Sequence, residues 1–259
     1  MSHDKGVAAG VAPSIVIGPS PNVVTDPAPN VVTSIDEIVE LIDSLDPARR
    51  IIVGITGPPG AGKSTIGESV VERIGERIST AAGPLRPTAG PLRPTARPLR
   101  PTAMLLGLDG FHLPQARLVE LGRRDRMGAA DTFDVDAFVD TLTNLRFSGA
   151  AVLAPGFDRE IEESVPDAIA VPPEKRVLVV EGNYLLHDAG GWERVAPLLD
   201  LTFFVQLDRD IRLQRLVKRH VRFGKSPDAA AAWANGPDEA NARLIEASSG
   251  RADHLIELD

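Results

Sequence analysis

The chain has 259 residues, which is enough for one large domain with a sizeable core and too few for two such domains. Its formal net charge of −8 gives no general affinity for nucleic acid or an anionic membrane, so an anionic ligand has to be bound locally. The lack of cysteine excludes disulfides and thiolate metal sites, and no stretch approaches the roughly 20 apolar residues of a membrane span. The first residues make a poor signal peptide, and we expect a cytoplasmic protein.

Residues 1–33 are rich in Pro, Gly, Ala and Val and contain the sequence PNVVT twice. They lack helical or strand periodicity, so we predict a flexible N-terminal tail and place the folded domain at residues 34–259. Ser34 and Glu37 have the spacing of a capping box, and apolar residues recur at helical intervals up to Leu45. This pattern predicts a short amphipathic helix beside the first strand.

The next segment, Ile51 to Thr65, reads IIVGITGPPGAGKST and joins an apolar strand to a G-x-x-x-x-G-K-[ST] phosphate loop. Glycines let several backbone N–H groups approach a phosphate chain, and a helix from Lys63 to about Ile78 would point its positive end at it. We expect Lys63 to reach the β and γ phosphates of ATP and the Ser64 hydroxyl to ligate Mg²⁺. A functionless glycine-rich turn is the weaker alternative. The predicted nucleotide-binding residues are Gly57, Pro58, Pro59, Gly60, Ala61, Gly62, Lys63, Ser64 and Thr65.

A seven-residue unit containing PLRPTA occurs three times in residues 83–103. Two prolines in every copy exclude a coiled coil, although the period is seven. We favour a tandem duplication tolerated in a surface loop over a Pro-rich docking segment that carries Arg86, Arg93 and Arg100.

The rest of the chain alternates apolar strands with helices. Strands are predicted at 103–109, 151–153, 176–181, 201–207 and 254–258, and helices at 135–147, 192–199, 210–223 and 238–248, with Asp134 as the cap of the first helix. This order predicts an α/β fold of three layers, in which helices cover both faces of a mostly parallel sheet.

Two acids end predicted strands, Asp109 and Glu181. Ligands bind at the carboxyl ends of parallel strands, so both acids should meet the phosphate loop in one crevice. Phosphoryl transfer to a hydroxyl needs one carboxylate beside the acceptor and another to hold Mg²⁺, directly or through water. Spacing leaves the two roles open, and a solvated carboxylate remains the alternative for each. His112 either binds substrate or hydrogen-bonds within the site.

Six basic residues follow between Arg212 and Lys225, on the predicted helix 210–223 and just after it. They would close as a lid over the transferring phosphate, unless they form an ordinary solvated face. The chain has neither the N-K-x-D motif of GTPases nor the S-G-G-Q signature of transport ATPases. A small-molecule kinase is therefore favoured.

The motifs GPPGAGKST, LDGFHL, RMGAADTFD, PGFDR, VVEGNYLL and RLQRLVKRHVRFG, in this order, resemble the phosphoribulokinase, uridine kinase and pantothenate kinase superfamily. The likeness is greatest to bacterial nucleoside/nucleotide kinase family proteins related to fructose-transport-system kinases. It implies a P-loop kinase fold with a helical lid, and ATP- and Mg²⁺-dependent phosphorylation of a hydroxyl. It also implies that Asp109 is the base, that Glu181 lies in the metal region with Ser64, and that Arg215 and Arg219 belong to the lid.

The resemblance extends to the acceptor pocket, whose predicted contacts are Asp109, His112, Arg126, Asp134, Asp158, Arg159 and Tyr184. The segment after Arg126 lacks the proline of related kinases. Uridine kinases have a tyrosine at the position of Phe157. Its absence here argues against a nucleoside as the acceptor. Asn183 and Tyr184 resemble the fructose-kinase-like branch.

These features favour a sugar or sugar-like acceptor. A uridine, nucleoside or pantothenate kinase is the alternative on the same scaffold. A third interpretation, from a different functional class, is a P-loop ATPase that acts as a regulator or chaperone of a protein and contacts this protein through the PLRPTA segment. A homodimer is compatible with each of these interpretations, and neither nucleic acid nor a membrane is an expected partner.

Overall fold

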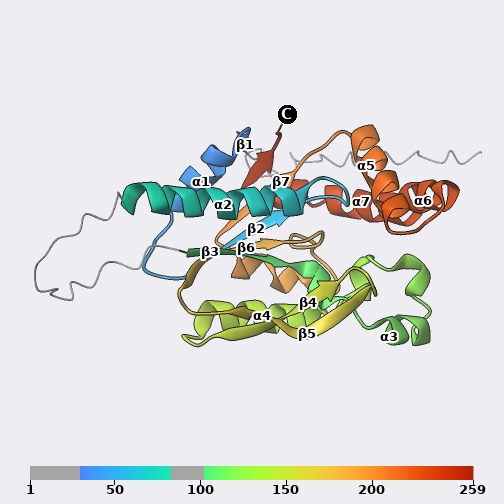
Figure 1. The fold of residues 1–259 in the computed structure, drawn as a ribbon, viewed down its shortest axis with the longest axis horizontal. Helices are drawn as coiled ribbons and strands as arrows, with labels where there is room; N and C mark the ends of the chain where they lie inside the picture. Colours follow the sequence, from blue (N-terminus) through green and yellow to red (C-terminus); the bar gives the residue numbers. More distant parts are fainter. Residues whose placement is uncertain (1–29, 83–101, 259) are drawn as a thin grey trace, which may run out of the picture.

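A computed structural model describes residues 30–82 and 102–258 of the chain (Figure 1). Its centre is a parallel six-stranded sheet with the strand order β1-β8-β7-β2-β6-β3. The strands are β1 Asn30–Val32, β2 Ile51–Thr56, β3 Thr102–Gly107, β6 Lys175–Glu181, β7 Leu201–Val205 and β8 His254–Ile256. The predicted parallel sheet is confirmed.

Helices cover both faces of this sheet. Those described are α1 Ile35–Asp43, α2 Lys63–Ala82, α3 Gln115–Glu120, α4 Val135–Phe147, α5 Arg209–Arg222, α6 Pro227–Trp233 and α7 Glu239–Glu246. Figure 1 shows α2 along one face and α4 on the other, with α5, α6 and α7 gathered near the start of α2. The three-layer α/β prediction is therefore confirmed.

Alternate residues of β6 point into two separate cores. Val177 and Val179 pack in the core under α1 and α2, whereas Leu178 and Val180 pack in the core on the α4 side. A strand covered on both faces needs an unbroken apolar run rather than alternation. This need explains the sequence RVLVV.

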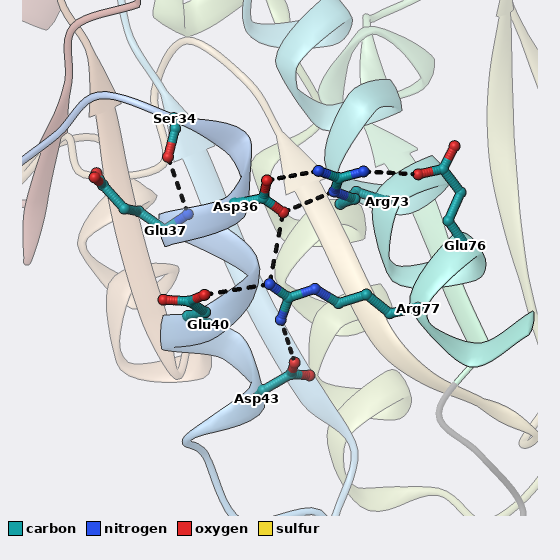
Figure 2. Close-up of polar contacts among 8 residues, drawn as sticks. All are labelled: Ser34, Asp36, Glu37, Glu40, Asp43, Arg73, Glu76 and Arg77. Carbon is teal, nitrogen blue, oxygen red and sulfur yellow. Dashed lines mark hydrogen bonds and ion pairs between the residues drawn. The ribbon is translucent and has the colours of Figure 1, made fainter. Parts of the chain in front are cut away.

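Ion pairs fasten α1 to α2 (Figure 2). Arg73 of α2 makes two hydrogen bonds to Asp36 of α1, at 2.7 and 2.5 Å. Arg77, one turn further on, contacts Asp36, Glu40 and Asp43 at 3.0–3.5 Å. These side chains are half-exposed, so the ion pairs contribute little to stability and mainly set the register of the two helices. The buried apolar face of α1 provides most of the stability with which this helix packs.

The predicted cap of α1 is present in a modified form. The Ser34 hydroxyl accepts a hydrogen bond from the Glu37 N–H at 3.2 Å. The Glu37 carboxylate accepts from the N–H of Thr33 at 2.8 Å, one residue before the cap itself. Backbone donors at both positions are satisfied, so the helix begins where the sequence places it.

The tail prediction is wrong for residues 30–32, because Asn30–Val32 form β1 and pair with β8. Val32 is buried there against the core. Residues 1–29 and 83–101, which hold the rest of the predicted tail and nearly all of the PLRPTA repeats, lie outside the described residues. Thr102, in the last repeat, already belongs to β3.

Three further predictions need correction. The strand expected at 151–153 is longer, β4 Val152–Asp158, and forms an antiparallel hairpin with the unpredicted β5 Glu163–Val171. The helix expected at 192–199 is two 3-10 turns, Trp192–Arg194 and Ala196–Leu198. Between α5 and α7, helix α6 and a π-helical turn at Ala234–Asp238 were not predicted.

Candidate active site

The loop between β2 and α2 depends on glycines. Gly57, Gly60 and Gly62 have φ angles of 149°, 82° and 100°, which other residues rarely adopt. A Cβ atom on Gly57 would also lie 2.8 Å from the Val205 carbonyl oxygen. The first N–H groups of α2 have no partner within the helix, so this loop presents backbone donors to an anion.

Lys63, the first residue of α2, is buried over this loop. Its Nζ atom donates a hydrogen bond to the Pro58 carbonyl oxygen at 3.0 Å. Burial lowers the pKa of Lys63 to about 8, although the charges of Glu181 and Asp109 oppose that change. An anionic ligand would favour the charged form of this amine.

Ser64 and Glu181 meet below the loop. The Ser64 hydroxyl donates to the Glu181 carboxylate at 3.1 Å. Burial, with a contribution from the charge of Asp109, raises the pKa of Glu181. A hydroxyl beside a buried carboxylate is an oxygen donor set that suits Mg²⁺, which takes few protein ligands and completes its shell with phosphates and water. The described residues contain no group of three or more His, Cys, Asp or Glu side chains that could enclose a metal ion.

Asp109 lies beyond the end of β3, in the 3-10 turn Leu108–Phe111. The strand therefore stops two residues earlier than the sequence predicts. The Asp109 carboxylate accepts a hydrogen bond from the Arg159 guanidinium at 2.8 Å. Arg159 follows β4, so the hairpin brings a predicted substrate contact onto the predicted base.

His112 both hydrogen-bonds within the site and lines it. Its Nδ1 atom lies 2.8 Å from the backbone oxygen of Asp109, and its ring packs on Phe133 with centroids 4.0 Å apart. Burial lowers the pKa of His112. A neutral ring with a proton on Nδ1 fits this contact, since a carbonyl oxygen only accepts.

One cavity of about 380 Å³ connects these groups. Arg215 and Arg219 of α5 line it. Twelve predicted residues line it, namely Pro59, Gly60, Gly62, Lys63, Ser64, Thr65, Asp109, His112, Arg159, Glu181, Arg215 and Arg219. The predicted convergence on one crevice is present in the structure.

Two predicted pocket residues are instead used by the local structure of residues 126–137. Arg126 is ion-paired with Asp131, at 2.7 Å for one of its two contacts. Asp134 caps α4 by accepting from the Ala137 N–H at 2.9 Å. Neither lines the cavity.

Asp158 and Tyr184 are likewise absent from the cavity wall. The Asp158 carboxylate accepts from the Glu160 N–H at 2.9 Å and so holds the hairpin turn. Tyr184 is fully buried, and its hydroxyl donates to the Gly128 oxygen at 2.6 Å. Tyr184 thus supports the loop at Gly128, which lines the cavity, but Tyr184 itself does not line it.

Part of the cavity wall was not predicted from the sequence. Lys225 lies 4.5 Å from the ring centre of Trp233, and the His220 ring is 2.7 Å from the Asp238 carboxylate. The unpredicted residues of the wall include Arg124, His220, Trp233, Asp238 and Asn241. Most of them lie in or beside α6 and the π-helical turn, where no motif marked them.

A buried ion pair orients α5. Arg212 is 1% exposed and donates to Glu239 of α7 at 2.5 Å, while Arg209 contacts the other oxygen at 2.7 Å. Two remaining nitrogen atoms of Arg212 have no partner within the described part of the chain. Since Arg215 follows Arg212 by less than one turn, this contact helps fix the side of the helix that faces the cavity.

A phosphate-cradling loop at the end of a parallel strand, with an acid and two arginines across the same cavity, is the arrangement of a P-loop kinase. Comparisons with known proteins agree. ATP-dependent kinase-like protein notR' of Aspergillus versicolor is 41% identical over 133 residues, which cover 48% of this chain and 77% of that protein. A uridine kinase of Clostridium perfringens is 26% identical over 67% of this chain and 69% of its own length.

Among solved structures, a candidate fructose transport system kinase from Silicibacter sp. TM1040 superposes with a TM-score of 0.73 at 32% identity, over 86% of this chain and 99% of that one. No protein-family model matches the chain. The chain belongs to the P-loop kinases related to uridine kinase that contain these relatives, and it is an ATP-dependent kinase of small molecules. The predicted resemblance is confirmed at this level. Within the described residues, no helix is long and apolar enough to cross a membrane.

Proposed function

We propose that this kinase transfers the γ-phosphoryl group of ATP to a hydroxyl of a sugar or a sugar-like metabolite. The observation that carries the proposal is the shared cavity, in which Lys63 and the phosphate loop face Asp109, with Arg215 and Arg219 entering from the lid helix. These are the groups that phosphoryl transfer requires, because the enzyme's task is to position two reactants and neutralise the charge between them.

The nucleotide phosphates would be held by the backbone N–H groups after Gly57 and by the Lys63 amine. Ser64 and Glu181 would hold Mg²⁺, which when bound neutralises phosphate charge. Their present hydrogen bond keeps both oxygen atoms on one side of the loop. The raised pKa of Glu181 supports this assignment, because a buried carboxylate without a full counter-charge is stabilised by a cation.

Asp109 would orient the acceptor hydroxyl or accept its proton. The Arg159 guanidinium contacts one of the two Asp109 carboxylate oxygens at 2.8 Å, so the hydroxyl would bind the other oxygen or exchange with the guanidinium. Both side chains are about half-exposed, so the exchange needs no opening of the core. Arg215 and Arg219 would then stabilise the charge on the phosphoryl group during transfer.

A sugar acceptor is supported by the solved relative described as a candidate fructose transport system kinase. A nucleoside is the second candidate, supported by the relatives named uridine kinase and by the aromatic rings of Phe133, Phe157 and Trp233 on the cavity wall. Aromatic rings bind the faces of sugars and of bases alike, so the acceptor panel has to include both classes.

The test is ADP release from the full chain with Mg-ATP, across sugars, polyols, nucleosides and pantothenate. We expect one acceptor class to stimulate release, and the variants Lys63→Ala and Asp109→Asn to abolish the stimulation. Asp140→Asn, which removes a charge on the exposed side of α4, serves as the matched control and should behave as wild type. A slow release that no acceptor changes, or stimulation that survives in Asp109→Asn, would refute the proposal.

A further inference from the structure

A second hollow of about 380 Å³ opens beside the active-site cavity. We call it the basic hollow. It is lined by Ser64, Arg159, Lys218, Arg219, Arg222 and Phe223. Four of these six residues are cations and none is an acid, although the chain as a whole carries a net charge of −8.

The cations of α5 lie on one side of this helix. Lys218 and Arg222 are four residues apart and therefore neighbours on the helix surface, with Arg219 next to them. Throughout residues 30–82 and 102–258, no carboxylate forms an ion pair with Lys218, Arg219 or Arg222. Arg159 has a partner in Asp109, on the floor of the neighbouring cavity. Like charges four residues apart destabilise a helix slightly, and a bound anion would reverse that effect.

The nucleotide already has its own set of cations. Lys63 and the lid residues Arg215 and Arg219 face the phosphate loop in the main cavity, where neither Lys218 nor Arg222 reaches the lining. The charges of Lys218 and Arg222 therefore have no role in the proposed phosphoryl transfer. The exposed ring of Phe223 adds an apolar wall next to them.

The basic hollow adjoins the active-site cavity. Ser64, Arg159 and Arg219 line both spaces, and Arg159 contacts Asp109 directly. A small molecule whose hydroxyl lies at Asp109 would thus extend past Arg159 toward Lys218 and Arg222. An anionic group at its far end would meet charge-assisted donors there.

We propose that the acceptor carries an anionic group, a phosphate or a carboxylate, which Lys218 and Arg222 bind in the basic hollow. This inference rests on the proposed function, whose acceptor it narrows to phosphorylated sugars, sugar acids and similar hydroxyl compounds. Arg159, which lines both spaces, would be a third ligand of the same group.

The first arm of the test measures binding. Inorganic phosphate is titrated calorimetrically into the full chain with the phosphate loop filled by Mg-ADP. The double variant Lys218→Ala/Arg222→Ala should bind phosphate at least about tenfold more weakly than wild type, since it loses two charge-assisted contacts. The control Arg117→Ala/Arg194→Ala removes two surface cations that line neither space, and it should leave phosphate affinity unchanged. Equal affinity in all three proteins would overturn the inference.

Mg-ADP and Mg-ATP affinities are measured in the same proteins. If the double variant binds the nucleotide about tenfold more weakly as well, its cations belong to the nucleotide site and the inference is wrong. Unchanged nucleotide affinity supports it.

The second arm measures kinetics with matched acceptors, each neutral compound beside its monophosphate or its acid. Wild type should favour the charged member by about tenfold or more in kcat/KM, and the double variant should lose that preference while retaining its rate with the neutral member. If free phosphate instead stimulates turnover of the neutral member, and the charged member has no advantage, the anion is a separate ligand and the acceptor assignment fails. If no acceptor is phosphorylated while phosphate binding is still lost in the double variant, the proposed function fails and an anion site alone remains.

Discussion

Lys63 should make nucleotide binding depend on pH in a range where few side chains titrate. In the free protein, burial lowers its pKa to about 8, whereas phosphates beside the amine favour the charged form and raise the pKa in the complex. Binding must therefore take up a proton wherever the free amine is neutral. The affinity is greatest below the pKa of the free protein and falls as pH rises through it.

The size of the effect follows from that pKa. At about pH 7, roughly nine molecules in ten carry a charged Lys63, and at about pH 9 roughly one in ten does. Provided that the bound amine stays charged, the affinity for Mg-ADP should fall about tenfold between these two values. Proton uptake should rise from about 0.1 to about 0.9 per nucleotide bound.

Calorimetry in two buffers of different ionisation enthalpy measures both quantities at once. The nucleotide phosphate contributes little above about pH 8, since its second pKa lies near 6. Burial raises the pKa of Tyr184, which keeps that hydroxyl neutral in this range. The variant Lys63→Met should bind weakly at every pH with no proton uptake. An affinity that is constant within about twofold in wild type between about pH 7 and pH 9 would refute the reasoning.

Three further variants test the chemistry and the core. Asp109→Asn should lower kcat by about 10²–10⁴-fold with nearly unchanged nucleotide affinity, because a positioned base acts on the acceptor and not on the nucleotide. Steady-state ADP release measures kcat, and calorimetry measures the nucleotide affinity. Leu178→Ala should destabilise the fold by about 2–5 kcal/mol in urea unfolding, since this side chain is fully buried in β6. Glu239→Ala should cost about 3–5 kcal/mol in the same assay, because Arg212 is left buried with no compensating charge, and an unchanged midpoint would show that water satisfies it.

Elements specified by short-range signals could be predicted from the sequence. Helix α4 begins and ends where expected, because Asp134 caps it and the apolar residues Phe138 and Leu142 repeat at helical spacing. The sequence of β6 identifies a strand covered on both faces, since a continuous apolar run of that length fits little else. Chain direction in a parallel sheet then brings Glu181 to the phosphate loop.

Features that depend on distant partners could not be predicted. Strand β5 is mostly exposed and has Pro166 in its interior, so only pairing with β4 makes it a strand. Asp109 and Arg159 are 50 residues apart, and their contact requires the hairpin geometry. Tyr184 lies within the motif VVEGNYLL, yet its side chain is buried in the core and its hydroxyl donates to the Gly128 oxygen. Nothing local distinguishes a supporting residue from a contacting one.

The pairing of β1 with β8 has a consequence for the connectivity of the chain. Asn30 lies beside His254, and Val32 beside Ile256, so the first and last described strands are neighbours. Each strand has three residues, so the carboxyl end of β8 and the amino end of β1 are roughly 10 Å apart along the strand direction, at about 3.3 Å per residue. A linker of about five residues could join Glu257 to Asn30, and the chain could then be opened between residues 82 and 102, at the end of α2 away from the phosphate loop (Figure 1). Such a circular permutant would keep every pair of neighbouring strands, although β3 would be synthesised first and α2 last. The sheet depends on which strands pair with each other and does not depend on the order in which they are synthesised.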